Sequence, residues 1–218
     1  SEFVSLAKAG GKNMEINWKQ NMNEIGGAFL LSWAVLGQMG GIEWAVAVAV
    51  AWMAFKGAHL LPVVTWSHMM TSDLSDVEGN WMANGMRLIS QVIGALLAII
   101  LMTEGDGDYA ATEMWITEIG DQYWMAIGMI AAGAVWWQIH TRCNSEWASG
   151  IGLMALASAM TLTGAHTMGA HLGSMEFDMI IDTVVNWIVN GALVGAGALI
   201  GVKIDDMIPS GEAEASAE

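Results

Sequence analysis

Six long apolar stretches, separated by short polar ones, divide most of the 218 residues of the chain. A transmembrane α-helix needs about 20 mainly apolar residues. Five of the stretches have roughly that length, and the second, which is shorter, counts as a crossing because the charge distribution described below requires it. The stretches lie at residues 25–40, 42–55, 81–102, 114–139, 147–163 and 184–204. The pattern predicts an all-α membrane protein with six transmembrane helices.

Two shorter segments interrupt this series, and they share a tetrapeptide. The first, Gly57–Met70, is broken by Pro62, and the second, Gly164–Ile181, is broken by glycines. Gly-Ala-His-Leu occurs in both, at 57–60 and at 169–172. Each copy follows the second stretch of a group of three, so we expect two related halves, at about 23–102 and 114–204. Three crossings per half give the halves opposite orientations, which makes the repeat an inverted one.

Basic residues indicate how the six helices are oriented. With six crossings, every Lys and Arg falls on the same side, and the opposite side receives an acidic loop at 103–113. Cytoplasmic loops carry the excess of Lys and Arg in membrane proteins. We therefore expect a multi-pass protein with both termini on the basic, cytoplasmic-equivalent side. The polar segment 1–22 precedes the transmembrane domain at 23–204, and an acidic tail at 205–218 is expected to be disordered.

Composition supports the membrane class and excludes others. Apolar residues make up 55% of the chain and charged residues only 13%, with a mean hydropathy of +0.47. A typical soluble domain has about 25% charged residues, so the lipid bilayer is the expected surrounding. The formal net charge of −15 argues against a nucleic-acid partner. No set of residues typical of a catalytic or metal site is evident, so we expect neither an enzyme nor a metal.

The first short segment resembles a known family signature. Its sequence, Gly57-Ala-His-Leu-Leu-Pro-Val-Val-Thr65, is similar to the Gly-Ala-His-Leu-Asn-Pro-Ala-Val-Thr of the major intrinsic proteins, the aquaporins and glycerol facilitators. The resemblance implies an aquaporin-like fold, in which two re-entrant half-helices from opposite faces meet at the middle of the membrane. It also implies a channel for water or small neutral solutes that assembles as a homo-tetramer.

The resemblance assigns roles to individual residues. In the family, an acidic residue in the first helix of each half braces the half-helix loop, and here Glu24 and Glu118 correspond to it. The pore and half-helix positions correspond to His59, Leu61, Pro62, Val63, His171, Gly173, Ser174, Met175 and Glu176.

The signature departs from the family at the residues that line its filter. Leu61 stands in place of the first asparagine, and Gly173–Glu176 in place of Asn-Pro-Ala-Arg. Leu61 and Met175 predict a dry, narrow constriction, which is the property of a closed gate. Glu176 in place of arginine would attract cations rather than repel them.

A second hypothesis fits the same departures. The chain has five histidines and twelve tryptophans, and a neutral imidazole can ligate a porphyrin or chlorophyll metal. The alternative is thus a non-conducting relative that serves as a structural or pigment-binding subunit of a larger membrane assembly. For the channel hypothesis, no cofactor is expected.

Overall fold

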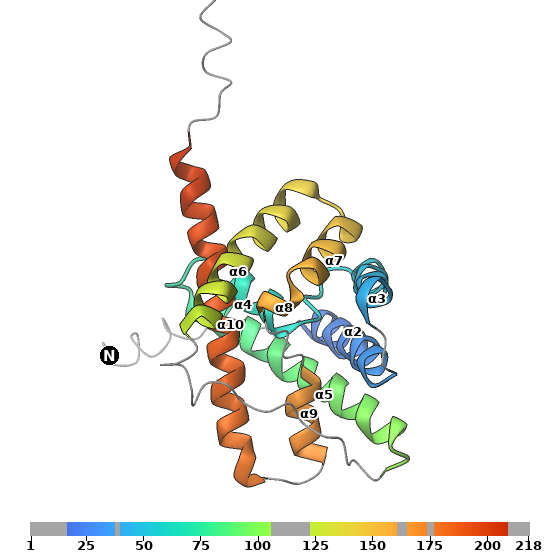
Figure 1. Cartoon of the computed structure of the whole chain (residues 1–218). Coiled ribbons are helices and arrows are strands. Elements are labelled where there is room, and N and C mark those ends of the chain that lie inside the picture. Colours follow the sequence, from blue (N-terminus) through green and yellow to red (C-terminus); the bar gives the residue numbers. More distant parts are fainter. Residues whose placement is uncertain (1–16, 38–39, 106–122, 161–164, 174–176, 209–218) are drawn as a thin grey trace, which may run out of the picture.

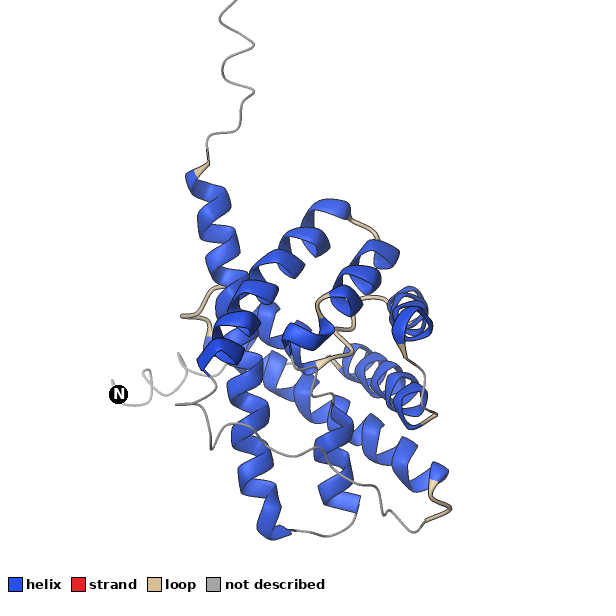
Figure 2. Cartoon of the chain, in the orientation of Figure 1, coloured by secondary structure: helices blue, strands red, loops and turns tan. Residues whose placement is uncertain are grey.

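The computed structural model describes residues 17–37, 40–105, 123–160, 165–173 and 177–208. All regular secondary structure in these ranges is helical, which confirms the all-α class (Figure 2). The longest helix, α10, runs along one side of the molecule (Figure 1). The helices are α2 (Trp18–Leu36), α3 (Gly41–Ala54), α4 (Pro62–Thr71), η1 (Val77–Met82), α5 (Ala83–Met102), α6 (Tyr123–Cys143), α7 (Glu146–Ala155), α8 (Ala157–Met160), α9 (Ala165–Gly173) and α10 (Phe177–Met207).

Two helical stretches in the described residues are long and apolar enough to cross a bilayer. They are Val77–Met102, which joins η1 to α5, and Thr183–Met207 within α10. The helix α3, Gly41–Ala54, is apolar but shorter. The sequence predicts six transmembrane helices, and the structure shows two stretches of sufficient length and apolarity. The six crossings therefore stay a prediction.

Helix boundaries recur along the chain at a spacing of 105 residues. Trp18 and Tyr123 begin α2 and α6, Gly41 and Glu146 begin α3 and α7, and Met102 and Met207 end α5 and α10. Packing recurs in the same way, because the two most extensive helix pairs are α2 with α5 and α6 with α10. The chain therefore contains two halves with the same succession of helices and the same neighbours.

Glycines allow the equivalent helices to approach closely. A Cβ atom on Gly94 of α5 would collide with the backbone carbonyl of Ile25, and one on Gly197 of α10 would collide with that of Ile130. Ile25 and Ile130 are again 105 residues apart. Small residues at helix crossings are typical of membrane bundles, in which van der Waals packing supplies most of the attraction between helices.

Several boundaries differ from the sequence-based expectation. The helix α2 begins at Trp18, inside the segment expected to precede the domain, because the side chain of Asn17 caps it by accepting a hydrogen bond from Gln20 N at 3.1 Å. The helix α10 begins at Phe177 rather than near residue 184, and it continues to Met207, into the stretch expected to be disordered. Residues 114–122 and 209–218 lie outside the described ranges.

The two Gly-Ala-His-Leu copies adopt different conformations. Residues 57–60 form an irregular loop in front of α4, whereas residues 169–172 lie inside the helix α9. The shared tetrapeptide thus has a different secondary structure in the two halves. Proline accounts for the difference, since Pro62 follows the first copy and favours a helix start there, and the second copy has no proline after it.

Candidate functional site

The loop before α4 has an unusual backbone. Gly57 has a φ of +82° and Leu60 a φ of +68°, so both residues lie in the left-handed region. Leucine is rarely found there and is strained by about 1–3 kcal/mol. Such strain persists only where surrounding contacts enforce it, and the contacts of this loop are therefore the first feature of the site.

Glu24 of α2 holds the loop from within the protein. Its carboxylate is fully buried and accepts hydrogen bonds from His59 N at 2.6 Å and Leu60 N at 2.8 Å. Two successive backbone N–H groups that point at one carboxylate form an anion-binding concavity. Glu24 thus makes the backbone contacts expected from its position in the sequence.

Arg87 and Gln91 of α5 complete the polar cluster around Glu24. Arg87 Nη1 donates to Glu24 Oε1 at 2.8 Å and to Gly57 O at 2.9 Å. Gln91 Nε2 donates to Glu24 Oε2 and to Thr65 Oγ1 of α4, each at 2.9 Å. The sequence patterns predict a site role for neither residue, since the basic residues indicate only the orientation of the helices. Their spacing of four residues on one predicted transmembrane helix, which places them on the same face, was the available signal.

A cavity of about 450 Å³ opens beside this loop. It lies at the C-terminal end of α3 and the N-terminal end of α7, and we call it the inner cavity. Polar and apolar groups contribute about equally to its walls. It is lined by Trp52, Lys56, Gly57, Ala58, His59, Val64, His68, His140, Asn144, Ser145, Glu146 and Ser149.

Three histidines from three segments meet at the inner cavity. The imidazole rings of His59 and His68 are stacked, with centroids 4.1 Å apart and planes 3° apart. His140 of α6 meets His68 edge to face at 5.8 Å, and its Nδ1 lies 2.9 Å from Ser149 Oγ. The sequence alone did not bring these three together, because His68 and His140 lie 72 positions apart and no shared motif links them.

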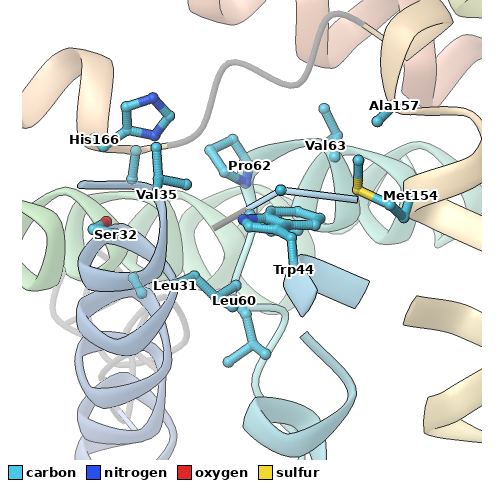
Figure 3. Close-up of a pocket in the computed structure, with 14 residues that line it drawn as sticks. Leu31, Ser32, Val35, Trp44, Leu60, Pro62, Val63, Met154, Ala157 and His166 are labelled. Atoms are coloured by element: carbon cyan, nitrogen blue, oxygen red, sulfur yellow. The ribbon is translucent and has the colours of Figure 1, made fainter. Parts of the chain in front are cut away.

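A second cavity, of about 270 Å³, lies at the opposite ends of the same helices. We call it the outer cavity, and Figure 3 shows its mostly apolar side chains, with Trp44, Met154 and Val63 grouped around it. Its polar side chains are Ser32, His166 and the indole of Trp44. The complete lining is Ala28, Leu31, Ser32, Val35, Gly40, Trp44, Leu60, Leu61, Pro62, Val63, Met154, Ala157, Ala165 and His166.

The two cavities are equivalent places in the two halves. Residues that line one cavity recur 105 positions away in the lining of the other, and four pairs follow this rule. The pairs are Val35 with His140, Gly40 with Ser145, Trp44 with Ser149, and Trp52 with Ala157. Because their equivalent positions carry different side chains, the inner cavity has a larger polar share than the outer one.

The first turn of α4 separates the cavities. Leu61, Pro62 and Val63 line the outer cavity, while Val64 and the preceding Ala58 and His59 line the inner one. Leu61, Val63 and Val64 are buried, with at most 5% of each exposed. An apolar barrier therefore stands between two cavities that open at opposite ends of α3 and α7.

The second set of predicted site residues is not assembled in the same way. His171 is buried within α9 and Gly173 is the last residue of that helix. Ser174, Met175, Glu176 and Glu118 lie outside the described residues. From the match of Ile25 to Ile130, the counterpart of Glu24 in the second half is Met129, which is also fully buried. Among the described residues, the second half thus repeats the succession of helices but has no carboxylate at the position equivalent to Glu24.

Comparison with known proteins adds no family to this description. No protein-family model, curated protein or solved structure matches the chain. Within the described ranges, no group of three or more His, Cys, Asp or Glu side chains is arranged to hold a metal ion. The fold and the site together define an all-helical protein, with two helical stretches suited to a membrane and two cavities related by an internal repeat.

Proposed function

We propose that the chain is an aquaporin-like membrane channel for water or small neutral solutes with an altered filter. The path would run through the inner cavity, past the first turn of α4, and into the outer cavity. The observation that carries this proposal is the equivalence of the two cavities in the two halves, with an apolar barrier between them. In transporters and channels built from inverted repeats, the solute path lies at the interface of the halves.

The directions of the equivalent helices support an inverted repeat. The inner cavity is lined by Trp52, near the end of α3, and by Glu146, at the start of α7. The outer cavity is lined by Trp44, near the start of α3, and by Met154, near the end of α7. The equivalent helices α3 and α7 therefore run in opposite directions. This arrangement is the one expected for six crossings, with α4 and α9 as the two short re-entrant elements.

Exposed side chains on the long helices support a lipid surrounding. Large apolar residues face outward on α3, α5 and α10, among them Val46, Ile93, Leu97, Val185 and Ile200. Water does not favour such surfaces, whereas the hydrocarbon of a bilayer does. A multi-pass protein with both termini on the basic side, and a homo-oligomer such as a tetramer, belong to the same proposal.

The filter would differ from that of the family because α4 begins with Leu61, which donates no hydrogen bond from its side chain. A hydrogen-bonding solute must give up contacts with water at an apolar barrier, at a free-energy cost of about 2–7 kcal/mol for each unmatched polar group. We therefore propose low permeability to water and a preference for small solutes with few hydrogen-bonding groups.

Stopped-flow light scattering of proteoliposomes tests the channel. The purified full chain is reconstituted, and the permeabilities to water, glycerol and ammonia are compared with those of empty vesicles. A blocking variant, Ala157→Trp, places a large ring in the outer cavity. The matched control, Ser158→Trp, places the same ring on the exposed neighbouring residue.

Permeability to at least one solute above that of empty vesicles, removed by Ala157→Trp and kept by Ser158→Trp, is the expected result. If all three solutes cross no faster than in empty vesicles, the channel proposal fails. The buried Leu61 and Val63 favour one specific alternative in that case, a non-conducting structural or pigment-binding subunit of a larger membrane assembly.

A further inference from the structure

The two equivalent cavities differ in chemistry. Where the outer cavity has Val35, Gly40 and Trp44, the inner cavity has His140, Ser145 and Ser149 at the equivalent positions. His59 and His68 add two more imidazoles to the inner cavity. If the solute kept the same protonation state along the whole path, this difference between the two cavities would have no explanation.

The charged side chains that line the inner cavity, Lys56 and Glu146, balance one another, whereas the chain as a whole is acidic. Lys56 lines it from the loop, and Arg87 lies beside the loop with its charge balanced by the buried Glu24. The one carboxylate in the described lining is that of Glu146, an exposed residue at the start of α7. Among the residues that line the inner cavity, no hydrogen bond joins a histidine side chain to a carboxylate. A protonated imidazole therefore has no fixed counter-ion among these residues.

His59, which lines the inner cavity, carries an unpaired polar atom. Its side chain is about nine-tenths buried, and its Nδ1 atom has no hydrogen-bond partner. Buried polar atoms are normally paired, and an unpaired one requires an explanation. Its ring lies flat against that of His68, so the two imidazoles form one stacked pair at the wall of the inner cavity.

We propose that the inner cavity binds a small carboxylate anion together with one proton, held between His59, His68 and His140. This inference rests on the proposed channel and gives its substrate class, a small monocarboxylic acid. The bound anion would supply the negative charge that the histidine cluster lacks. Imidazolium and carboxylate form a charge-assisted hydrogen bond, roughly twice as strong as a neutral one.

The proton balance links binding to passage. A proton from the inner solution adds to a ring nitrogen of His68, the central imidazole of the cluster, and the imidazolium attracts the anion. The N–H bond then breaks as an O–H bond forms on the carboxylate, which leaves a neutral imidazole and a neutral acid. The neutral acid can cross the apolar barrier of Leu61, Val63 and Val64, whereas an ion would have to lose its hydration there.

Calorimetric titration of the full chain in nanodiscs of zwitterionic lipid tests the binding step. Sodium formate is the probe, because it stays ionised at both pH 5.5 and pH 7.5, and sodium chloride of equal ionic strength is the blank. We expect the dissociation constant of formate to be at least tenfold lower at pH 5.5, since linkage to one proton changes affinity by up to tenfold per pH unit. Titrations at pH 7.5 in two buffers of different ionisation enthalpy should show uptake of one proton per formate.

Two histidine variants separate this site from a general effect of histidine. His68→Gln keeps a polar side chain without a titratable group, and formate affinity should fall at least tenfold at pH 5.5. His166→Gln makes the same change in the outer cavity and should leave the affinity unchanged. If His68→Gln does not fold, the pH dependence and proton uptake of the unaltered chain still decide the matter.

Three results would overturn the proposal: no formate binding at either pH, binding without proton uptake, or an equal loss in His166→Gln. Tighter binding of ammonium chloride than of sodium formate would also overturn it, because a cation site would then be present. Failure of the channel proposal gives a different result: the proteoliposomes would show no permeability to water, glycerol or ammonia, while formate and a proton still bind.

Discussion

Arg87 Nη1 lies 2.8 Å from Glu24 Oε1, and this ion pair joins α2 to α5 across 63 positions of sequence. Glu24 is fully buried and the Arg87 side chain is 12% exposed. The same carboxylate accepts the N–H groups of His59 and Leu60. A buried ion pair adds little net stability relative to a well-packed apolar pair, but breaking one partner leaves an unpaired charge. The pair therefore positions the loop before α4 and makes that loop sensitive to substitution.

Glu24→Gln should destabilise the protein strongly. The substitution leaves Arg87 without its carboxylate partner, and the new NH₂ group faces donors rather than acceptors. Breaking a buried pair in this way costs about 3–5 kcal/mol. Thermal unfolding in detergent, followed by circular dichroism, should show a clearly lower Tm.

Glu43→Gln is the matched control, since Glu43 is an exposed carboxylate on α3. Its Tm should equal that of the unaltered chain. The double variant Glu24→Gln, Arg87→Gln should lose less than the sum of the two single losses, because the pair interacts directly. Additive losses would show that the two side chains act independently.

The surface pair of Arg142 and Asp205 should behave differently. It joins the end of α6 to α10, and its side chains are 61% and 47% exposed. Exposed pairs contribute about 0–1 kcal/mol, since water and salt screen them. We expect Arg142→Ala to lower the Tm by much less than Glu24→Gln, and a comparable drop would contradict the distinction between the two pairs.

Close helix packing gives a prediction for Gly197. A methyl group there would meet the backbone carbonyl of Ile130 on α6, which cannot move aside. Gly197→Ala should therefore destabilise the protein by about 1–3 kcal/mol. Gly128→Ala on α6 meets nothing within 4 Å and should be neutral or stabilising by up to about 1 kcal/mol. The two variants are compared by thermal unfolding, and equal Tm values would exclude a tight α6–α10 contact.

The sequence predicted the all-α class, because hydrophobic runs are local signals, and it singled out Glu24, which contacts the loop before α4. It did not predict the register of the repeat. The recurring tetrapeptide matches residue 57 to residue 169, a spacing of 112, whereas the helices recur at 105. The identical tetrapeptides gave the wrong register because the conformation of a tetrapeptide depends on its neighbours. Only the first copy precedes a proline.

Residues that are equivalent at 105 positions differ in chemistry at the polar positions of the two halves. Glu24 corresponds to Met129 and Val35 to His140, so a comparison of residue types does not match these positions. Backbone packing preserves the repeat, while the side chains in the two cavities have diverged. The histidine cluster could not be predicted from the sequence either, because it depends on how α4, α6 and the loop before α4 pack together.

Leu61→Asn should raise the water permeability of the proposed channel. Leu61 is buried at the start of α4, on the outer-cavity side of the barrier. An asparagine there offers a donor and an acceptor to a passing water molecule, which lowers the desolvation cost at the barrier. We expect a several-fold increase in the osmotic swelling rate of proteoliposomes. Leu61→Met keeps the barrier apolar and should leave the rate unchanged, so an equal rise in both variants would point to loosened packing instead.

Cys143 offers a test of the orientation of the helices. It is the single cysteine of the chain, it is exposed, and it follows Arg142 at the end of α6, on the side expected to be basic. Glu104 lies beyond the end of α5, on the side expected to be acidic and exposed to the other aqueous phase. In intact cells, a membrane-impermeant maleimide should label Glu104→Cys in a Cys143→Ser background, and should label native Cys143 only after the membrane is opened. Labelling of both positions from the same side would contradict a single crossing by α6 between them, because the ends of α5 and α6 would then face one compartment.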